Sequence, residues 1–455
     1  MIHTYKLNGY NIVIDAASGS VHCVDNLAYD VINRFEEKTA SEIISELCEK
    51  YGSAAEQDIV QTMADIKELI QAGTLFSKDT FEDIADMRPK TRTVIKALCL
   101  HVSHLCNMTC GYCFAGQGEY HGQSGLMSLE TGKRAIDFLI ENSAGRKNLE
   151  VDFFGGEPLL NWDIVKQIVG YAREREVDCG KNFRFTLTTN GLLIDDDVIE
   201  FSNREMHNVV LSLDGRKETH DRLRKNTSGG GSYDEIVPKF QKFVDLRDGK
   251  GYYIRGTFTK QNPDFTNDIF HMAELGFKEL SMEPVVSSQE DEFSLGDAEL
   301  ERIKEQYELL AAGMLKRQSE GRGFTFYHFM IDLKNGPCVY KRISGCGSGT
   351  EYLAVTPQGE LFPCHQFVGI PEFLVGNIWD GVTTPAVCEE FSRCNIYSKN
   401  ECKTCWARLY CSGGCAANAF HSTGSIDGIY EFGCEIFKKR MECAIMMKVA
   451  EKLSL

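Results

Sequence analysis

The chain has 455 residues, of which 43% are hydrophobic and 25% charged, the composition of an ordinary globular protein with enough apolar residues for several cores. Its formal net charge of −17 argues against nucleic acid as a partner. No apolar run approaches membrane-spanning length and no signal peptide is visible, so we expect a cytoplasmic protein without a membrane partner. In that compartment the 18 cysteines favour metal or cluster binding over disulfides.

Residues 1–85 are predicted to form a small separate domain with a winged-helix order of elements. Asn8-Gly9 supplies the positive φ angles of a two-residue hairpin turn, and Thr39 with Glu42 forms a capping box. No basic recognition helix is visible, which speaks against the DNA binding often associated with this pattern. We expect strands at 5–7, 10–15, 21–24 and 74–76, and helices at 26–37, 40–51 and 56–71.

Residues 93–333 alternate between strand and helix patterns, which predicts an α/β fold with a parallel sheet, a partial (β/α)6 barrel. A helix at 297–319 is expected to lead out of this barrel. The strands are expected at 93–102, 149–154, 183–189, 209–213, 252–258 and 279–284, and the helices between them at 129–142, 162–177, 195–203, 233–246 and 265–275.

The loop after the first of these strands carries Cys106, Cys110 and Cys113 at a C-x3-C-x2-C spacing. Three cysteine sulfurs can hold a [4Fe–4S] cluster and leave one iron without a protein ligand. An open iron can bind a substrate, as a catalytic metal site does through its free position. A zinc loop or three incidental cysteines are the alternatives, but the spacing with Tyr112 before the last cysteine favours the cluster.

This triplet resembles that of the radical S-adenosylmethionine (SAM) enzymes. The resemblance implies that Cys106, Cys110 and Cys113 hold a catalytic [4Fe–4S] cluster, that SAM binds its open iron, and that Tyr112 contacts adenine. It also implies that reductive cleavage of SAM gives a 5′-deoxyadenosyl radical, which removes a hydrogen atom from an unactivated carbon.

Other strand ends fit the same resemblance. Gly155, Gly156 and Glu157 match the turn that binds the SAM amino group, and glycine lets backbone approach a ligand closely, although the motif alone would be only a turn. Ser212 matches the residue that hydrogen-bonds the ribose. Arg255, in an apolar strand, needs a buried anionic partner, either the SAM carboxylate or an internal ion pair.

From residue 336 the chain becomes rich in glycine and cysteine, a composition with little apolar core of its own. Its cysteines resemble the seven-cysteine SPASM pattern of peptide and sulfatase maturases, which implies two auxiliary [4Fe–4S] clusters in residues 336–455. With Cys338 as an eighth ligand beside these seven, the three clusters use three, four and four cysteines, eleven of the 18. Two zinc ions are the alternative for the tail. The resemblance assigns Cys338, Cys346, Cys364 and Cys415 to the nearer cluster and Cys402, Cys405, Cys411 and Cys434 to the outer one.

His365 occupies the place where sulfatase-type dehydrogenases of this family carry an aspartate base, so we include it among the candidate catalytic residues. Over nearly its whole length the chain most resembles the maturases of six-cysteine (SCIFF) peptides. This implies thioether bonds from cysteine sulfur to an acceptor α-carbon, that of threonine, in a ribosomally made peptide (RiPP). A substrate thiolate on the nearer auxiliary cluster, with the auxiliary clusters as the route for the released electron, would complete the oxidoreductase reaction.

In this resemblance, residues 1–85 bind the leader of the precursor peptide as an extra strand on a sheet edge, with a purely structural domain as the alternative. The expected partners are thus a Cys-rich precursor peptide with its leader and a reduced electron donor such as a ferredoxin or flavodoxin. A sulfatase-type dehydrogenase and a non-catalytic iron–sulfur redox or sensor protein are the alternative functions.

Overall fold

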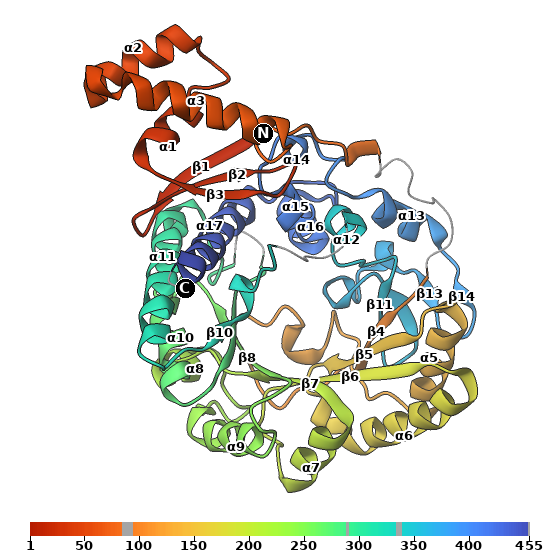
Figure 1. Ribbon diagram of the computed structural model, residues 1–455. Coiled ribbons are helices and arrows are strands. Elements are labelled where there is room, and N and C mark those ends of the chain that lie inside the picture. Colours follow the sequence, from red (N-terminus) through yellow and green to blue (C-terminus); the bar gives the residue numbers. More distant parts are fainter. Residues whose placement is uncertain (84–93, 288–290, 334–338, 454–455) are drawn as a thin grey trace.

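The computed structural model describes residues 1–83, 94–287, 291–333 and 339–453. Its first part, the N-terminal module (residues 1–76), is a three-stranded antiparallel sheet in the order β1-β2-β3, followed by three helices (Figure 1). Asn8 and Gly9 have φ angles of 50° and 82°, as the predicted hairpin turn requires. The elements are β1 (Ile2–Leu7), β2 (Tyr10–Asp15), β3 (Val21–Val24), α1 (Asn26–Ile32), α2 (Ala40–Tyr51) and α3 (Glu56–Gln71).

The small sheet packs in two directions because successive side chains of a strand point to opposite faces. Val13 belongs to a separate apolar core that also contains Leu47 of α2 and Ile59 of α3. Ile12 and Ile14, on the other face, belong to the main core of the chain. The module therefore has its own core and also rests firmly on the rest of the protein.

The central part is a curved parallel sheet with its helices on the convex side (Figure 1). Its strand order is β10-β9-β8-β7-β6-β5-β4-β11, so that the chain winds from the middle of the sheet outward. The strands are β4 (Ala97–Ser103), β5 (Asn148–Gly155), β6 (Asn182–Thr189), β7 (Met206–Ser212), β8 (Tyr252–Phe258), β9 (Glu279–Pro284), β10 (Thr325–Phe326) and β11 (Tyr352–Val355).

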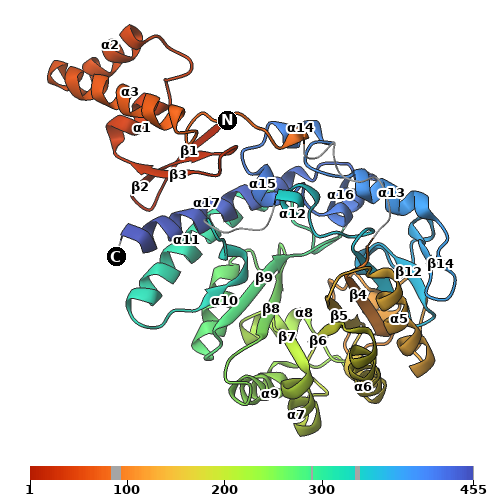
Figure 2. The same cartoon turned by 45° about the vertical axis from the view of Figure 1, so that its right-hand side comes forward.

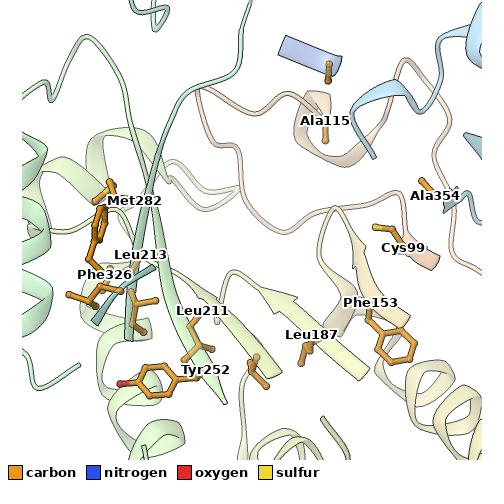
Figure 3. Packing of buried hydrophobic residues seen from close by; sticks show 14 of the residues in the cluster. Cys99, Ala115, Phe153, Leu187, Leu211, Leu213, Tyr252, Met282, Phe326 and Ala354 are labelled. Atoms are coloured by element: carbon orange, nitrogen blue, oxygen red, sulfur yellow. The ribbon is translucent and has the colours of Figure 1, made fainter. Parts of the chain in front are cut away.

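The helices cover the outer face of this sheet, where Phe153, Leu187, Leu211 and Tyr252 are buried (Figure 3). The alternate residues of the same strands, such as Arg255, face the inner side, which we call the lumen. The partial-barrel prediction is thus confirmed. The helices are α5 (Leu129–Asn142), α6 (Trp162–Cys179), α7 (Asp196–Glu205), α8 (Lys217–Leu223), α9 (Tyr233–Asp245), α10 (Phe265–Glu274) and α11 (Asp297–Ser319), with short 3-10 turns η2 (Gly116–Gly118), η3 (Pro158–Asn161) and η4 (Tyr327–Phe329).

The tail, residues 339–453, closes over the lumen and ends in the long helix α17, which lies beside α11 and beneath β1 (Figures 1 and 2). Its first strand, β11, pairs parallel with β4, and three further strands continue the sheet antiparallel. The remaining elements are α12 (Val339–Ser344), β12 (Glu360–Phe362), β13 (Gly376–Asn377), β14 (Gly381–Val382), α13 (Pro385–Arg393), α14 (Asn400–Lys403), α15 (Arg408–Cys411), α16 (Ala416–Thr423) and α17 (Glu431–Leu453).

Several predicted elements differ from the structure. The first helix stops at Ile32, because the side-chain amide of Asn33 donates to the carbonyl of Tyr29 and the chain then continues in turns. Residues 74–76 form no strand, and helix α8 was not predicted. The helix at 297–319 does not leave the barrel but leads into β10 beside β9. The tail is not poor in core either, since residues such as Leu353 and Phe367 are fully buried in the main apolar cluster.

Candidate active site

The cysteine loop (residues 106–113) leaves the C-terminal end of β4. The Gly111 N–H fixes it by donating to the carbonyl of Leu223, the last residue of α8, at 3.0 Å. Burial raises the pKa of the Cys106 thiol to about 12 and that of Cys110 to about 11. Iron would take these thiols as thiolates and supply the missing positive charge, so their buried placement fits a cluster.

The Gly-Gly-Glu turn after β5 packs directly on the start of the cysteine loop. The Gly156 N–H donates to the Ser103 carbonyl at 2.8 Å, and the Glu157 N–H donates to the Leu105 carbonyl at 2.9 Å. A Cβ on Gly155 would lie 2.2 Å from the Ser103 oxygen, and one on Gly156 would lie 2.2 Å from the Leu105 oxygen. The glycines are therefore required for contact between two backbone segments, whereas the sequence suggested approach to a ligand.

The Glu157 carboxyl is buried at the centre of this arrangement. Its Oε1 accepts hydrogen bonds from the Leu159 N–H at 3.0 Å and the Thr189 hydroxyl at 2.8 Å, and its Oε2 accepts one from the Asn190 N–H at 2.8 Å. Burial nevertheless raises its pKa to about 7. Glu157 thus joins the ends of β5 and β6, and the predicted contact with the SAM amino group stays a prediction.

Tyr112 is held by a buried acid. Its hydroxyl donates to Asp214 Oδ2 at 2.6 Å, and Arg224 Nε donates to the same oxygen at 3.0 Å. The Arg224 guanidinium also lies 5.5 Å from the centre of the Tyr112 ring. Because the hydroxyl is occupied inside the protein, the predicted contact with adenine would use the ring.

Asn190, directly after β6, links the end of that strand to the cysteine loop. Its side-chain N–H group donates to Asn107 Oδ1 at 2.8 Å and to Cys106 Sγ at 3.8 Å. A hydrogen bond to a thiolate favours the charged form. Asn190 is therefore placed to orient Cys106.

Ser212 and Arg255 lie side by side on the inner face of the sheet, where β7 pairs with β8. Arg255 was expected to be buried with an anionic partner, but its side chain is exposed to the lumen. Among the described residues it forms no hydrogen bond or ion pair, although its charge, after those of His328 and Arg440, lowers the pKa of buried Glu283. The internal ion pair is therefore absent from this part of the chain, and the SAM carboxylate stays a prediction.

His365 reaches the same lumen from the tail. Its ring centre lies 5.6 Å from that of Phe114, which follows the cysteine loop, and 5.1 Å from that of Phe154 at the end of β5. Burial, and then the charge of Arg255, lowers its pKa to about 4, so that the imidazole is neutral at pH 7. The structure thus brings the predicted base next to the cysteine loop.

Two buried histidines lie beneath the cysteine loop. His104 Nδ1 donates to the carbonyl of Gln123 at 2.6 Å, so its Nε2 accepts the hydrogen of His101 Nδ1 at 3.0 Å. His101 Nε2 is then a buried acceptor with no hydrogen-bond partner among the described residues. Burial lowers the pKa of His104 to about 4, which keeps this pair neutral.

The tail cysteines fall into two sets. Burial and then the charges of Cys415 and Cys346 raise the pKa of Cys364, which places these three thiols within electrostatic range of one another. Cys338, the fourth predicted member, lies outside the described residues. The second set is Cys402, Cys405, Cys411 and Cys434; burial and the other three members raise the pKa of Cys411 to about 12.

The assignment of these two sets to auxiliary clusters stays a prediction; the raised pKa values of Cys364 and Cys411 suit a bound cationic group, which favours thiolates. Within residues 1–83, 94–287, 291–333 and 339–453, no three His, Cys, Asp or Glu side chains converge on a position for a single metal ion.

Across the same described residues, no helix combines the length and apolar character needed to cross a membrane.

A cavity of about 400 Å³ lies between the rim of the barrel and the tail. It is lined by Lys260 and Leu295 on the barrel side, and by Asn418 of α16 and by Tyr430 and Phe432 near the start of α17. Both apolar and charged side chains face it.

Sequence reasoning missed Asp214, Asn190, Arg224 and the His101–His104 pair. Asp214 and Asn190 each precede a glycine at a strand end, which was a usable signal for a polar side chain at the rim. Arg224 and the histidines carried no such signal, because their role depends on partners from other segments.

Comparison with known proteins agrees with this geometry. The Radical SAM superfamily matches residues 100–264. The radical SAM cyclopropyl synthase TigE of Paramaledivibacter caminithermalis is 24% identical over 442 residues, which cover 91% of this chain and 88% of TigE. The cysteine-type anaerobic sulfatase-maturating enzyme of Clostridium perfringens is 26% identical over 364 residues, 74% of this chain and 93% of that enzyme.

Two solved structures share the fold. Native anSMEcpe with bound AdoMet has a TM-score of 0.65 at 22% identity, covering 79% of this chain and 100% of that one. Streptococcus suis SuiB bound to the precursor peptide SuiA has a TM-score of 0.54 at 16% identity, covering 94% of this chain and 97% of SuiB. Residues 100–264 are therefore a radical SAM domain.

Proposed function

We propose that this enzyme matures a Cys-rich, ribosomally made precursor peptide by joining a cysteine sulfur to the α-carbon of an acceptor residue, threonine in the expected case. The observation that carries the proposal is the meeting of two cysteine sets at one lumen. Phe114, next to the cysteine loop, contacts His365, which directly follows Cys364 of the tail. A substrate between them could meet both sets.

Cys106, Cys110 and Cys113 would hold the catalytic cluster, and the Gly155–Glu157 turn, Tyr112, Ser212 and Arg255 would surround SAM. When bound, the cluster and SAM supply the one-electron chemistry that removes a hydrogen atom from an unactivated carbon. The chain contributes the geometry. The Glu157 carboxyl joins the glycine turn to the end of β6, and Asp214 fixes the position of Tyr112.

Arg255, in the middle of β8, presents an exposed guanidinium that forms no ion pair within the described residues, and it suits a carboxylate. The surrounding barrel and the tail limit the access of water, which would otherwise compete for a reactive carbon.

The nearer auxiliary set, Cys346, Cys364 and Cys415 with Cys338, would bind iron beside the lumen. If Cys338 does not bind, one iron stays open for the thiolate of the substrate. Forming a C–S bond from a C–H and an S–H group removes two hydrogens and two electrons from the peptide. The SAM-derived group would take one hydrogen atom, the thiol proton would be released, and the auxiliary clusters would take the remaining electron.

The N-terminal module would bind the leader of the precursor peptide. Its edge strand β1 is covered by α17, whereas β3, the other edge of the sheet, pairs only with β2 among the described residues. An extended peptide can add to such an edge through main-chain hydrogen bonds. The complex of the related SuiB fold with its precursor peptide supports a peptide substrate for this chain as well.

A dehydrogenase of the sulfatase-maturing type is the second candidate, because such an enzyme is a relative and His365 stands beside the cysteine loop. A base is essential for that reaction. A thiol bound to iron, in contrast, has already lost its proton to the metal. His365→Ala should therefore slow thioether formation only modestly but abolish a dehydrogenase reaction.

The test is anaerobic turnover of a leader-bearing peptide, with a ferredoxin or flavodoxin as reductant, followed by exhaustive iodoacetamide treatment and fragmentation. We expect a loss of two hydrogens, one labelled thiol fewer and a cysteine linked to another residue. An aldehyde with an unchanged thiol count would establish the dehydrogenase instead. Absence of SAM cleavage on reduction would leave a non-catalytic redox or sensor protein.

A further inference from the structure

A carboxylate near the end of β9 faces the lumen. Successive residues of this strand alternate between the two faces of the sheet, with Met282 in the buried outer core (Figure 3) and Glu283 on the inner face, as Arg255 is on β8. The Glu283 side chain is 33% exposed. Val285, two residues further along, lines the cavity of about 400 Å³ at the rim. Glu283 is therefore an acid that a ligand in the lumen can reach.

Two side chains hold Glu283 from the side of the tail. Arg440 of α17 donates from Nη1 to Glu283 Oε2 at 3.4 Å and from Nη2 to His328 Nδ1 at 3.0 Å. A guanidinium only donates, so His328 Nε2 carries the ring hydrogen, 3.3 Å from Glu283 Oε1 and 3.1 Å from Ser281 Oγ. Among the described residues each carboxylate oxygen thus has one donor, and each keeps room for a second.

Glu283 lies on the side of the lumen where adenosine is predicted. Its partner in register is Thr257, whose N–H donates to Asp214 Oδ1 at 2.9 Å, and Asp214 Oδ2 holds the Tyr112 hydroxyl at 2.6 Å. Ser212, the predicted ribose contact, is on β7, two strands from β9 and thus about 10 Å from it across the sheet. A peptide residue presented to the ribose end of SAM would therefore lie near Glu283.

The carboxylates that follow the neighbouring strands are already engaged. Glu157, after β5, and Asp214, after β7, are fully buried, and each accepts three hydrogen bonds from the described residues. Of these three acids, Glu283 is the one that is exposed and keeps open acceptor positions.

We propose that Glu283 binds and positions the peptide substrate, its carboxylate accepting a hydrogen bond from the acceptor residue, either from the side-chain hydroxyl or from the main-chain N–H. This inference rests on the proposed function, which supplies the peptide. The Arg440 guanidinium favours the ionised form of Glu283, and a peptide that covers an ionised carboxylate must supply a donor, because a buried charge without one is costly. Both donors are close to the α-carbon, so the bond would fix the direction of its C–H group.

The experiment compares three leader-bearing peptides with the reconstituted full chain. Their acceptor is threonine, valine, which lacks the hydroxyl, or threonine with an ester oxygen in place of its main-chain N–H. Each peptide is tested with the parent, Glu283→Gln and Glu279→Gln. Glu279 is the matched control, because it lies on the same face at the other end of β9 and accepts from the Thr325 hydroxyl at 3.3 Å. The measurements are kcat/KM for crosslinking and, without reductant, the Kd of each peptide.

We expect the preference of the parent for threonine over one modified peptide to fall about tenfold in Glu283→Gln, which weakens one hydrogen bond to a charged group. Glu279→Gln should keep the preference of the parent. A fall for valine identifies the hydroxyl as the donor, and a fall for the ester identifies the main-chain N–H. Each preference is a ratio within one protein, so a general loss of activity cancels, and Kd gives the ratio for a variant that does not turn over.

Unchanged preferences in Glu283→Gln, or an equal fall in Glu279→Gln, would overturn this inference while crosslinking by the parent stands. A parent that cleaves SAM but does not crosslink the threonine peptide would overturn the proposed function, and the inference with it.

Discussion

His3 and Glu442 are 439 positions apart in the chain, and their side chains meet at 2.9 Å, from His3 Nε2 to Glu442 Oε1. The hydroxyl of Tyr5 donates to the Glu442 carbonyl at 2.9 Å, and the His3 ring stacks on Trp406 with ring centres 4.1 Å apart. The N-terminal module is thus joined through β1 both to the last helix and to the segment between Cys405 and Cys411.

His3→Ala should loosen this junction, because it removes a hydrogen bond and a ring contact that together contribute about 1–2 kcal/mol. We expect faster limited proteolysis between the module and the barrel and weaker modification of leader-bearing peptide, with reductive SAM cleavage unchanged. His22→Ala is the matched control, since His22 bonds to the Thr74 carbonyl inside the module. Equal proteolysis of the two variants would contradict the role given to the junction.

Gly156→Ala should displace the cysteine loop, because the new Cβ would lie 2.2 Å from the backbone oxygen of Leu105. Backbone cannot move aside as a flexible side chain can. We expect the loss of about four irons per chain, the content of one cubane, together with SAM cleavage, while the tail retains its iron. Iron analysis and the cleavage assay measure both.

The control for this change is Gly170→Ala in α6, where an added Cβ meets nothing within 4 Å. Alanine is the better helix former, so this variant should be as stable as the parent or slightly more stable. If Gly156→Ala kept all its iron, the contact between the glycine turn and the cysteine loop would not be needed for cluster binding.

His220 should make the stability of the protein depend on pH below neutrality. Burial lowers its pKa to about 4, from 6.5 in an exposed histidine. The unfolded chain therefore binds a proton before the folded one, so the stabilising contribution is complete above pH 6.5 and is lost as the pH falls toward 4. Between pH 7.5 and 5.5 the loss is about 1.3 kcal/mol.

His220→Gln tests this point, because the amide can replace both hydrogen bonds of the ring. His220 Nδ1 accepts from the Asp214 N–H at 3.3 Å, and Nε2 lies 2.9 Å from the Ser232 hydroxyl. In urea unfolding at the two pH values, the variant should lose about 1.3 kcal/mol less than the parent on acidification. An identical loss in both proteins would show that His220 does not titrate between the two states.

Tyr112→Phe should weaken SAM binding by about 1–3 kcal/mol, since it leaves the buried Asp214 carboxylate with one donor fewer beside the cofactor. Equilibrium binding of SAM to the reconstituted protein measures the change. Tyr171→Phe is the control, because Tyr171 also donates to an aspartate, Asp137, but on the outer helices. The assignment of Tyr112 to the SAM site fails if both variants bind SAM like the parent.

Local signals in the sequence predicted the regular elements well. The capping box of Thr39 and Glu42 set the start of α2, and the predicted bounds of α3, α5, α11, β8 and β9 are those of the structure. The pairing of β11 with β4 joins residues about 250 positions apart, such as Tyr352 and Ala97, and no local pattern encodes such a contact.

In the candidate site, too, local patterns were predictable and contacts between distant residues were not. The cysteine spacing and the family resemblance define the cysteine sets by residue type and separation, and their role as cluster ligands stays a prediction. Which groups Asn190 and Arg224 contact was not predictable, since Glu157 and Tyr112 become their neighbours only when the chain folds. Arg255 was expected to be buried because its strand is apolar, but its side chain points to the open lumen.

One uninterrupted helix, α17, carries Cys434, Arg440 and Glu442. Arg440 approaches Glu283 at the lumen, with 3.4 Å between Nη1 and Oε2, and Glu442 holds the N-terminal module. At 1.5 Å of rise per residue, Cys434 and Glu442 are separated by about 12 Å along a rigid rod. A chimera that exchanges the N-terminal module between two related chains would therefore have to exchange α17 as well, because a shift of this helix would displace Cys434 and Arg440 together.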